Sequence, residues 1–261
     1  MKTTYFVACV GLFLFCHPQS QGALVLSGTS YVQTFDSIGS GLPTGWSVRT
    51  GANASFEGTA ASFTTAATSW GDTTGAFKNV ASSDGLTSGA STAVQAASTD
   101  RALGIRQTGT LGDPGGAFVL QIDKTLGLKN FALSLKAQML SVQTRSTTWT
   151  IDYRIGDSGS FTTLATYSDP GAFGSTSFSF NSSQLSTWNN QASDIWFRVV
   201  ALGGSTGSSS RDTFAIDDFT LGYSPVPEPH VLGIISGLGL LAIFGIRTWR
   251  ERRSGGIGIG N

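Results

Sequence analysis

Histidine and cysteine, the side chains that most often serve as bases, nucleophiles and zinc ligands, are confined to the two ends of this 261-residue chain. Cys9, Cys16 and His17 lie near the N-terminus, and His230 lies near the C-terminus. The stretch from Ala23 to Tyr223 contains neither residue type. This excludes disulfides, zinc sites of the usual ligand types, Cys–His catalysis and a Ser–His–Asp triad within that stretch.

Two serine motifs match nucleophile signatures. The segment Gly203–Gly207 fits the pattern G-x-S-x-G, and Gly156–Gly159 reads Gly-Asp-Ser-Gly. A serine hydroxyl is a poor nucleophile unless a base takes its proton, and no histidine is at hand. A nucleophile elbow also needs a helix after the turn, and no helical pattern follows here. Both segments are therefore predicted to be loops.

Carboxylates are the remaining candidates for catalysis. Between Ala23 and Tyr223 the chain has thirteen aspartates and one glutamate, Glu57. A glycosidase needs two carboxyl groups that face one cleft, one of them with a raised pKa. A secreted glycan-active hydrolase with an Asp pair therefore stays open as an alternative. Most of these aspartates lie in turns or on the polar face of predicted strands, where solvation explains them.

The pair Asp217–Asp218 interrupts an alternating pattern. Phe214 and Ile216 share one parity, whereas the apolar residues from Phe219 onward have the opposite parity. This change of parity predicts a β-bulge at the aspartates.

Tryptophans are the candidates for sugar stacking. Trp149 and Trp196 have apolar neighbours in predicted strands, so core packing explains them. Trp70 and Trp188 have polar neighbours and are the two candidate carbohydrate contacts. The chain carries no net charge, with 16 Lys and Arg against 16 Asp and Glu. The folded body has no basic run, which argues against nucleic acid as a partner.

Strands must position these residues. Several stretches alternate apolar and polar residues with period two, and one is apolar on both faces except at Arg198, as a central strand would be. These stretches are 118–122, 131–139, 149–155, 195–202 and 214–223. Turn-rich segments separate them, and 81–99, rich in Ser, Thr, Ala and Gly, is predicted to be a long exposed loop. We expect residues 23–223 to form an all-β, two-sheet antiparallel β-sandwich of jelly-roll type.

Residues 1–22 have the pattern of a signal peptide. Lys2 precedes an uncharged apolar run from Tyr5 to Phe15, which is too short to span a membrane as a mature helix. Small residues at Ser20 and Gly22 favour cleavage before Ala23.

Residues 224–261 have the pattern of a membrane anchor. A proline-rich segment, Ser224–Pro229, precedes an uncharged apolar run from Val231 to Ile246. As a helix this run would be about 24 Å long, and flanking residues can extend it to a bilayer core of about 30 Å. An arginine cluster follows and is expected to stay cytoplasmic. It consists of Arg247, Arg250, Arg252 and Arg253.

This C-terminal arrangement resembles the PEP-CTERM sorting signal of exported bacterial proteins, which has a Val-Pro-Glu-Pro motif, a short spanning helix and an arginine cluster. The resemblance implies that an exosortase-type membrane enzyme recognises the motif and removes the tail. The motif residues are Val226, Pro227, Glu228 and Pro229. The chain departs from the family pattern in its extra tail, Ser254–Asn261. A permanent tail anchor is the alternative.

The body resembles jelly-roll modules similar to cleaved-adhesin and MAM domains. The opening segment 35–46, the hairpin 151–164 and the closing segments 195–198 and 214–219 carry the resemblance. In similar modules, acidic residues near the first and last strands hold a structural calcium ion. By this resemblance, Asp36, Asp217 and Asp218 are candidate calcium ligands.

These features together predict an exported, non-enzymatic protein of the cell surface or extracellular matrix. As a precursor it would be anchored in the inner membrane by its C-terminal helix, and it would later be at the surface or outside the cell. Its β-sandwich is expected to bind carbohydrate or exopolysaccharide. The alternatives are the Asp-pair hydrolase and a purely structural surface module.

Overall fold

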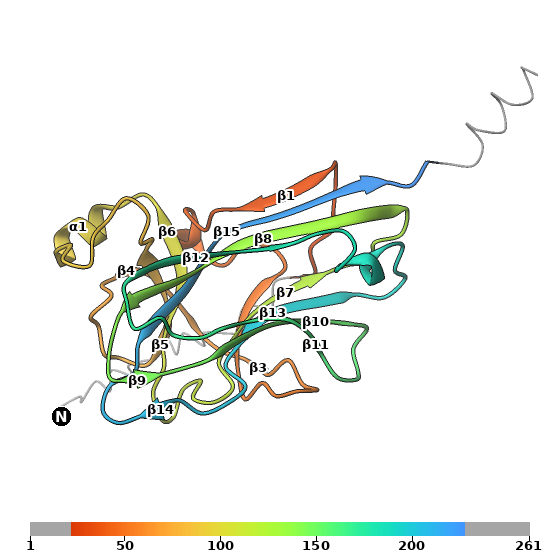
Figure 1. The fold of residues 1–261 in the computed structure, drawn as a ribbon. Helices are drawn as coiled ribbons and strands as arrows, with labels where there is room; N and C mark the ends of the chain where they lie inside the picture. Colours follow the sequence, from red (N-terminus) through yellow and green to blue (C-terminus); the bar gives the residue numbers. More distant parts are fainter. Residues whose placement is uncertain (1–21, 228–261) are drawn as a thin grey trace, which may run out of the picture.

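The computed structural model describes residues 22–227 (Figure 1). The predicted signal peptide up to residue 21, the motif residues Glu228 and Pro229, and the predicted membrane helix with its four arginines lie outside the described residues. Within 22–227, no helix has the length and apolar character needed to cross a membrane.

Two stacked β-sheets form the body, so the prediction of an all-β, two-sheet sandwich is confirmed. The first sheet, in spatial order, contains β12 (Gly174–Phe180), β8 (Leu128–Ser141), β15 (Thr213–Pro225), β6 (Arg101–Arg106), β5 (Ala76–Ala81) and β4 (Phe63–Thr68), and β1 (Ser30–Gln33) also pairs with β15. The second contains β11 (Thr162–Tyr167), β10 (Trp149–Ile155), β13 (Ile195–Val200), β7 (Ala117–Ile122), β2 (Trp46–Thr50) and β3 (Thr59–Ala60). Pairing within both sheets is antiparallel except between β4 and β5. A small separate ribbon pairs β9 (Arg145–Ser146) with β14 (Thr206–Gly207).

The strand β15 has two neighbours on one of its sides. Its first half pairs with β6, whereas its second half pairs with β1, which Figure 1 shows alongside the end of β15. On its other side β15 pairs with β8, and this register shifts between Asp217 and Thr220. Asp218 has a φ of 47°, in the left-handed region. The β-bulge predicted at the aspartates is confirmed.

Aromatic side chains fill the space between the sheets. Trp149 stacks on Phe214 with ring centroids 4.2 Å apart, and Trp46 meets Phe219 edge to face at 5.2 Å. Phe214 and Phe219 lie on either side of the bulge, and both are buried. The bulge therefore keeps both halves of β15 facing the same core although the parity of the sequence changes.

The outer face of the second sheet is covered instead of exposed. Arg198 of β13 is fully buried, and its guanidinium pairs with both carboxylate oxygens of Asp152 on β10, at 2.7 and 3.0 Å. The ring of Phe161 lies 3.4 Å from the guanidinium, and the carbonyl of Phe56 accepts another of its hydrogen bonds. Asp152 was expected on a solvated polar face. That expectation is wrong, because the segment before β3 and Phe161 close over the sheet.

One helix interrupts the segment that was predicted to be a loop. Residues 92–97 form α1 (Thr92–Ala97), whose N-cap Ser91 accepts a hydrogen bond from the backbone N–H of Val94. Gln95 is the buried residue of this helix. Six residues are too few to show a helical period in the sequence, so the prediction of a loop over the whole of 81–99 is wrong at this point. Among the described residues, two further helical turns are the 3-10 segments Ile38–Ser40 and Ser186–Trp188.

Candidate functional site

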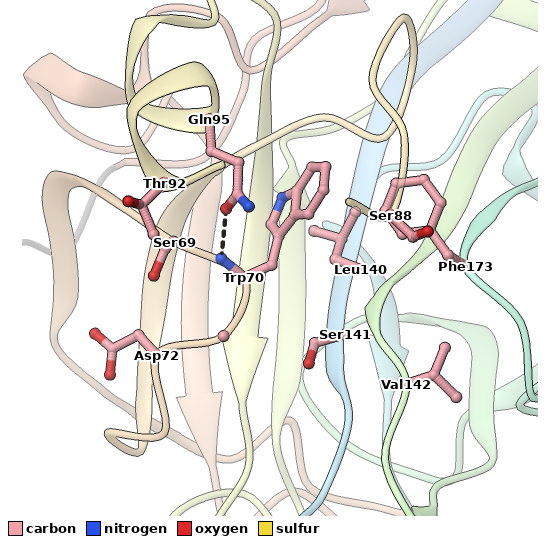
Figure 2. A pocket seen from close by; sticks show the side chains of 11 residues that line it. Ser69, Trp70, Asp72, Ser88, Thr92, Gln95, Leu140, Ser141, Val142 and Phe173 are labelled. Carbon is pink, nitrogen blue, oxygen red and sulfur yellow. Dashed lines mark hydrogen bonds between the residues drawn. The ribbon is translucent and has the colours of Figure 1, made fainter. Parts of the chain in front are cut away.

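A surface cavity of about 620 Å³ opens on the outer face of the first sheet (Figure 2). Four segments form its walls: the turn before β5, the segment that carries α1, the end of β8 and the loop before β12. The residues that line it are Ser69, Trp70, Gly71, Asp72, Ser88, Thr92, Gln95, Leu140, Ser141, Val142 and Phe173.

Trp70 holds two of these walls together. Its indole N–H donates a hydrogen bond to the carbonyl of Ala81 at 2.8 Å, and its backbone N–H donates to Oε1 of Gln95 at 2.8 Å. The amide group of Gln95 in turn donates to the carbonyl of Ala90. These bonds tie the turn around Trp70 to β5 and to α1, so the cavity has a rigid wall on this side.

The opposite wall is apolar. The ring of Phe173 is tilted against that of Trp70 with centroids 5.0 Å apart, and Phe173 itself is half-buried. Leu140 and Val142 of β8 and the following loop lie beside it. Phe173 thus offers a partly accessible ring, held in place by its contact with the indole. An isolated Phe in the polar loop after Pro170-Gly171 was the sequence signal for this residue, and the sequence reasoning missed it.

Small polar side chains surround this apolar wall. Ser88 and Thr92 are exposed, and Ser69 and Ser141 are half-buried. Within residues 22–227, the hydroxyls of Ser88 and Thr92 make no hydrogen bond, so they can bond to a ligand. A cavity with an apolar wall and a few polar groups that fix orientation has the general make-up of a small-ligand site.

The cavity has one ionisable side chain among its described lining residues, Asp72. Oδ1 of Asp72 accepts a hydrogen bond from the backbone N–H of Thr74 at 2.8 Å and lies 3.4 Å from Nζ of Lys78. The hydrogen bond from Thr74 lowers the pKa of Asp72, so the carboxylate stays ionised at neutral pH. A carboxyl group that acts as a general acid needs a raised pKa instead.

The two tryptophans that were predicted to contact carbohydrate lie in different parts of the structure. Trp188 is fully buried between the sheets, where its ring packs against Tyr153 at 5.5 Å and Phe131 at 6.0 Å. Its prediction as a sugar contact is therefore wrong. Trp70 does line the cavity, but it is only 2% exposed. The indole of Trp70 supports Phe173 and cannot itself be an open stacking surface.

The three predicted calcium ligands bond to protein groups. Asp36 accepts a hydrogen bond from the backbone N–H of Arg101 at 2.9 Å. Asp217 is 1% exposed and accepts from Nε2 of Gln138 at 3.2 Å and from the backbone N–H of Asp218. Oδ2 of Asp218 lies 2.7 Å from Nζ of Lys136.

A lysine supplies the positive charge among these acidic groups. Nζ of Lys136 lies between the carboxylates of Asp218 and Asp84, 2.5 Å from Asp84. Hydrogen bonds from Lys136 to these two aspartates raise the pKa of its ammonium. In the described part of the chain, no group of three or more Asp, Glu, His or Cys side chains is arranged to hold a metal ion. The residues do not fit the calcium site that the resemblance implied.

Two aspartates, Asp217 of β15 and Asp212 just before this strand, have strongly raised pKa values. The pKa of Asp217 is raised to about 8, mainly by burial and in smaller part by the nearby carboxylates of Asp218 and Asp100. Burial likewise raises the pKa of Asp212 to about 7, with a further contribution from Asp169. Neither Asp212 nor Asp217 lines the cavity, and both are at least 95% buried.

Comparisons with protein-family models and with curated proteins find no match to this chain. Among solved structures, the chain is similar to a cleaved adhesin domain of the Lys-gingipain from Porphyromonas gingivalis, with 12% identity, 74% of this chain and 98% of that chain covered, and a TM-score of 0.40. It is also similar to the xylan-binding domain from CBM 22, with 10% identity, 77% and 99% covered, and a TM-score of 0.41. The corresponding values for the xylan-binding module CBM15 are 11% identity, 77% and 100% covered, and a TM-score of 0.39.

Chelation of divalent cations is expected to leave the melting temperature of the purified full-length protein unchanged, because Lys136 supplies the cation between Asp84 and Asp218. Replacing Lys136 with Met leaves two carboxylates facing each other. Because these side chains are partly exposed, we expect the free energy of unfolding to fall by about 1 kcal/mol. This would lower the melting temperature by about 2–4 °C. The exposed Lys124→Met is the control. A drop in melting temperature on adding chelator to the unmodified protein would contradict this assignment.

Stability is expected to depend on the ionisation of Asp217. Its pKa is about 8 in the folded state against a usual 3.8, so folding favours the protonated carboxyl. The stability that the protonated carboxyl contributes to the folded state is present in full below about pH 4. It is lost as the pH rises from there through about 8. Thermal unfolding should therefore show falling stability between pH 5 and pH 9. Asp217→Asn should match the unmodified protein within about 1 kcal/mol at pH 4 and exceed it at pH 9. The control Asp123→Asn should keep the original pH profile, and stability that rises with pH would refute the assignment.

Proposed function

We propose that the β-sandwich binds carbohydrate in the cavity between Trp70 and Phe173, and that the protein acts without catalysis. The observation that supports this most is the make-up of the cavity. One wall offers the half-buried ring of Phe173, and the rim offers the hydroxyls of Ser88 and Thr92. A sugar ring has apolar C–H groups on its faces and hydroxyls at its edges. The C–H groups can pack on the ring of Phe173, and the hydroxyls can bond to Ser88 and Thr92.

The arrangement of carboxyl groups favours binding over hydrolysis. Glycosidases place two carboxyl groups about 5–10 Å apart across the scissile bond, and one of them carries a raised pKa. Only Asp72 is available among the described residues that line the cavity, and its pKa is lowered. The aspartates whose pKa is raised most, Asp212 and Asp217, are buried and do not line the cavity. This cavity thus lacks the pair of carboxyl groups that the Asp-pair hydrolase would need.

The proposed location follows from the two ends of the sequence. The signal pattern of residues 1–22 and the motif Val226–Pro229, the apolar run and the arginine cluster support export followed by sorting through a PEP-CTERM signal. The last strand, β15, ends at Pro225, and Val226 is 40% exposed. An exposed start of the motif is compatible with recognition by a membrane enzyme. The body would then work at the cell surface or in an extracellular polymer.

Binding without turnover is the expected behaviour of the purified full-length protein. On a panel of bacterial polysaccharides it should be retained by at least one polymer and should release no reducing ends from it. Phe173→Ala removes the accessible ring and should weaken retention about tenfold. The control is Phe56→Ala, since Phe56 is an exposed phenylalanine in the segment that covers the outer face of the second sheet. Release of reducing ends would support the hydrolase, and retention by no polymer would support a purely structural module.

Processing at both ends is expected in the native host. Mass spectrometry of the mature protein should find a chain that starts near Ala23 and lacks the residues after the Val226–Pro229 motif. A protein with Glu228→Gln should keep its C-terminal tail, because the substitution removes the one charge of the motif. The control variant, Glu251→Gln beyond the apolar run, should lose its tail as the unmodified protein does. A mature chain with an intact tail would instead favour the permanent anchor.

A further inference from the structure

The charges around the cavity are unevenly distributed. Asp72 is the ionisable residue of its described lining, and its side chain is 36% exposed. Figure 2 shows Asp72 and Phe173 on opposite sides of Trp70. A ligand that contacts the ring of Phe173 and extends across the cavity therefore approaches a fixed negative charge at the far side.

Two cations close to Asp72, Lys78 and Arg106, are buried behind the wall and bonded to it. The Lys78 side chain is 3% exposed, and its Nζ donates to the carbonyl of Asp72 at 3.1 Å in addition to its ion pair with the same residue. Arg106 is 3% exposed, and its Nη1 donates to Oγ1 of Thr213 at 3.1 Å. That hydroxyl donates to the carbonyl of Trp70 at 2.7 Å. Neither cation can turn toward a ligand without breaking bonds that hold the wall.

This distribution has opposite consequences for charged and uncharged sugars. A uronic acid would bring its carboxylate out of water toward Asp72 without a cation to pair with it, which costs free energy. An uncharged sugar has hydroxyl donors, and an ionised carboxylate is an acceptor that forms strong hydrogen bonds with them. The hydroxyls of Ser88 and Thr92 can donate or accept and so suit the same ligand.

We propose that Asp72 is the hydrogen-bond acceptor that makes this cavity select uncharged glycans over polymers of uronic acids. The inference rests on the proposed carbohydrate binding and names the class of ligand and the residue that selects it. The hydrogen bond from Thr74 and the ion pair with Lys78 hold the carboxylate in place. Asp72 is thus already positioned before the ligand binds, which reduces the entropy lost on binding.

The test compares two probes on the purified full-length protein, an uncharged glucan and polygalacturonate, by affinity electrophoresis at low and high salt. The glucan should retard the protein equally at both salt concentrations, and polygalacturonate should not retard it. Asp72→Asn keeps the size of the side chain but loses the charge, and it should weaken glucan binding about tenfold. Asp123→Asn is the matched control, and a melting curve for each variant verifies that it is folded.

The outcomes separate the two proposals. Retardation by polygalacturonate equal to or stronger than that by glucan would overturn the selection by Asp72 and leave carbohydrate binding standing. Unchanged glucan binding in a folded Asp72→Asn variant would overturn the role of Asp72 in the same way. If neither these probes nor any polymer of the wider panel binds, carbohydrate binding fails and the selection fails with it.

Discussion

The backbone pairing of β15 is the constraint on which the rest of this structure depends. One side of the strand pairs with β8, while the other side is shared between β6 and β1. The change of neighbour falls where the register with β8 shifts, between Asp217 and Thr220. Since an extra residue reverses which face each following side chain occupies, the bulge keeps Phe214 and Phe219 in one core. Without it, the apolar side chains in one half of β15 would face away from the core.

The same bulge links the core to the cavity. It leaves Asp217 buried beside Gln138 and Asp218 beside Lys136, whose ammonium also contacts Asp84. Asp84 belongs to the segment after β5 that carries α1, so the ion pairs hold this segment against the sheet. The helix in turn presents Gln95, which binds the backbone of Trp70 in the cavity wall. A continuous set of polar contacts thus runs from the sheet register to the candidate binding site.

Most of the strands that the sequence predicted share one physical property, a period of two in hydrophobicity. It placed the strands around 118–122, 131–139 and 149–155 and, from its slip, the bulge in β15. The run 195–202 was predicted as a central strand on a different ground, because it is apolar on both faces except at Arg198, and it contains β13. Short strands such as β5, with Lys78 and Asn79 buried, carry no such period and were missed. Trp188 was misjudged because its sequence neighbours are polar, although a 3-10 turn directs its ring into the core.

Residue types and their order were sufficient to determine that the body is all-β, that it contains no imidazole or thiol chemistry, and that its last strand has a bulge at Asp217–Asp218, because these properties depend on local pattern alone. The tertiary structure decided which polar groups meet. Lys136 lies 52 residues from Asp84 and 82 from Asp218, and Trp70 lies 25 residues from Gln95. Pairings at such separations are determined by strand order and register, which no local pattern encodes. They pair Asp218, one of the expected metal ligands, with Lys136, which also contacts Asp84. They also make Phe173, packed against Trp70, the partly accessible ring of the cavity.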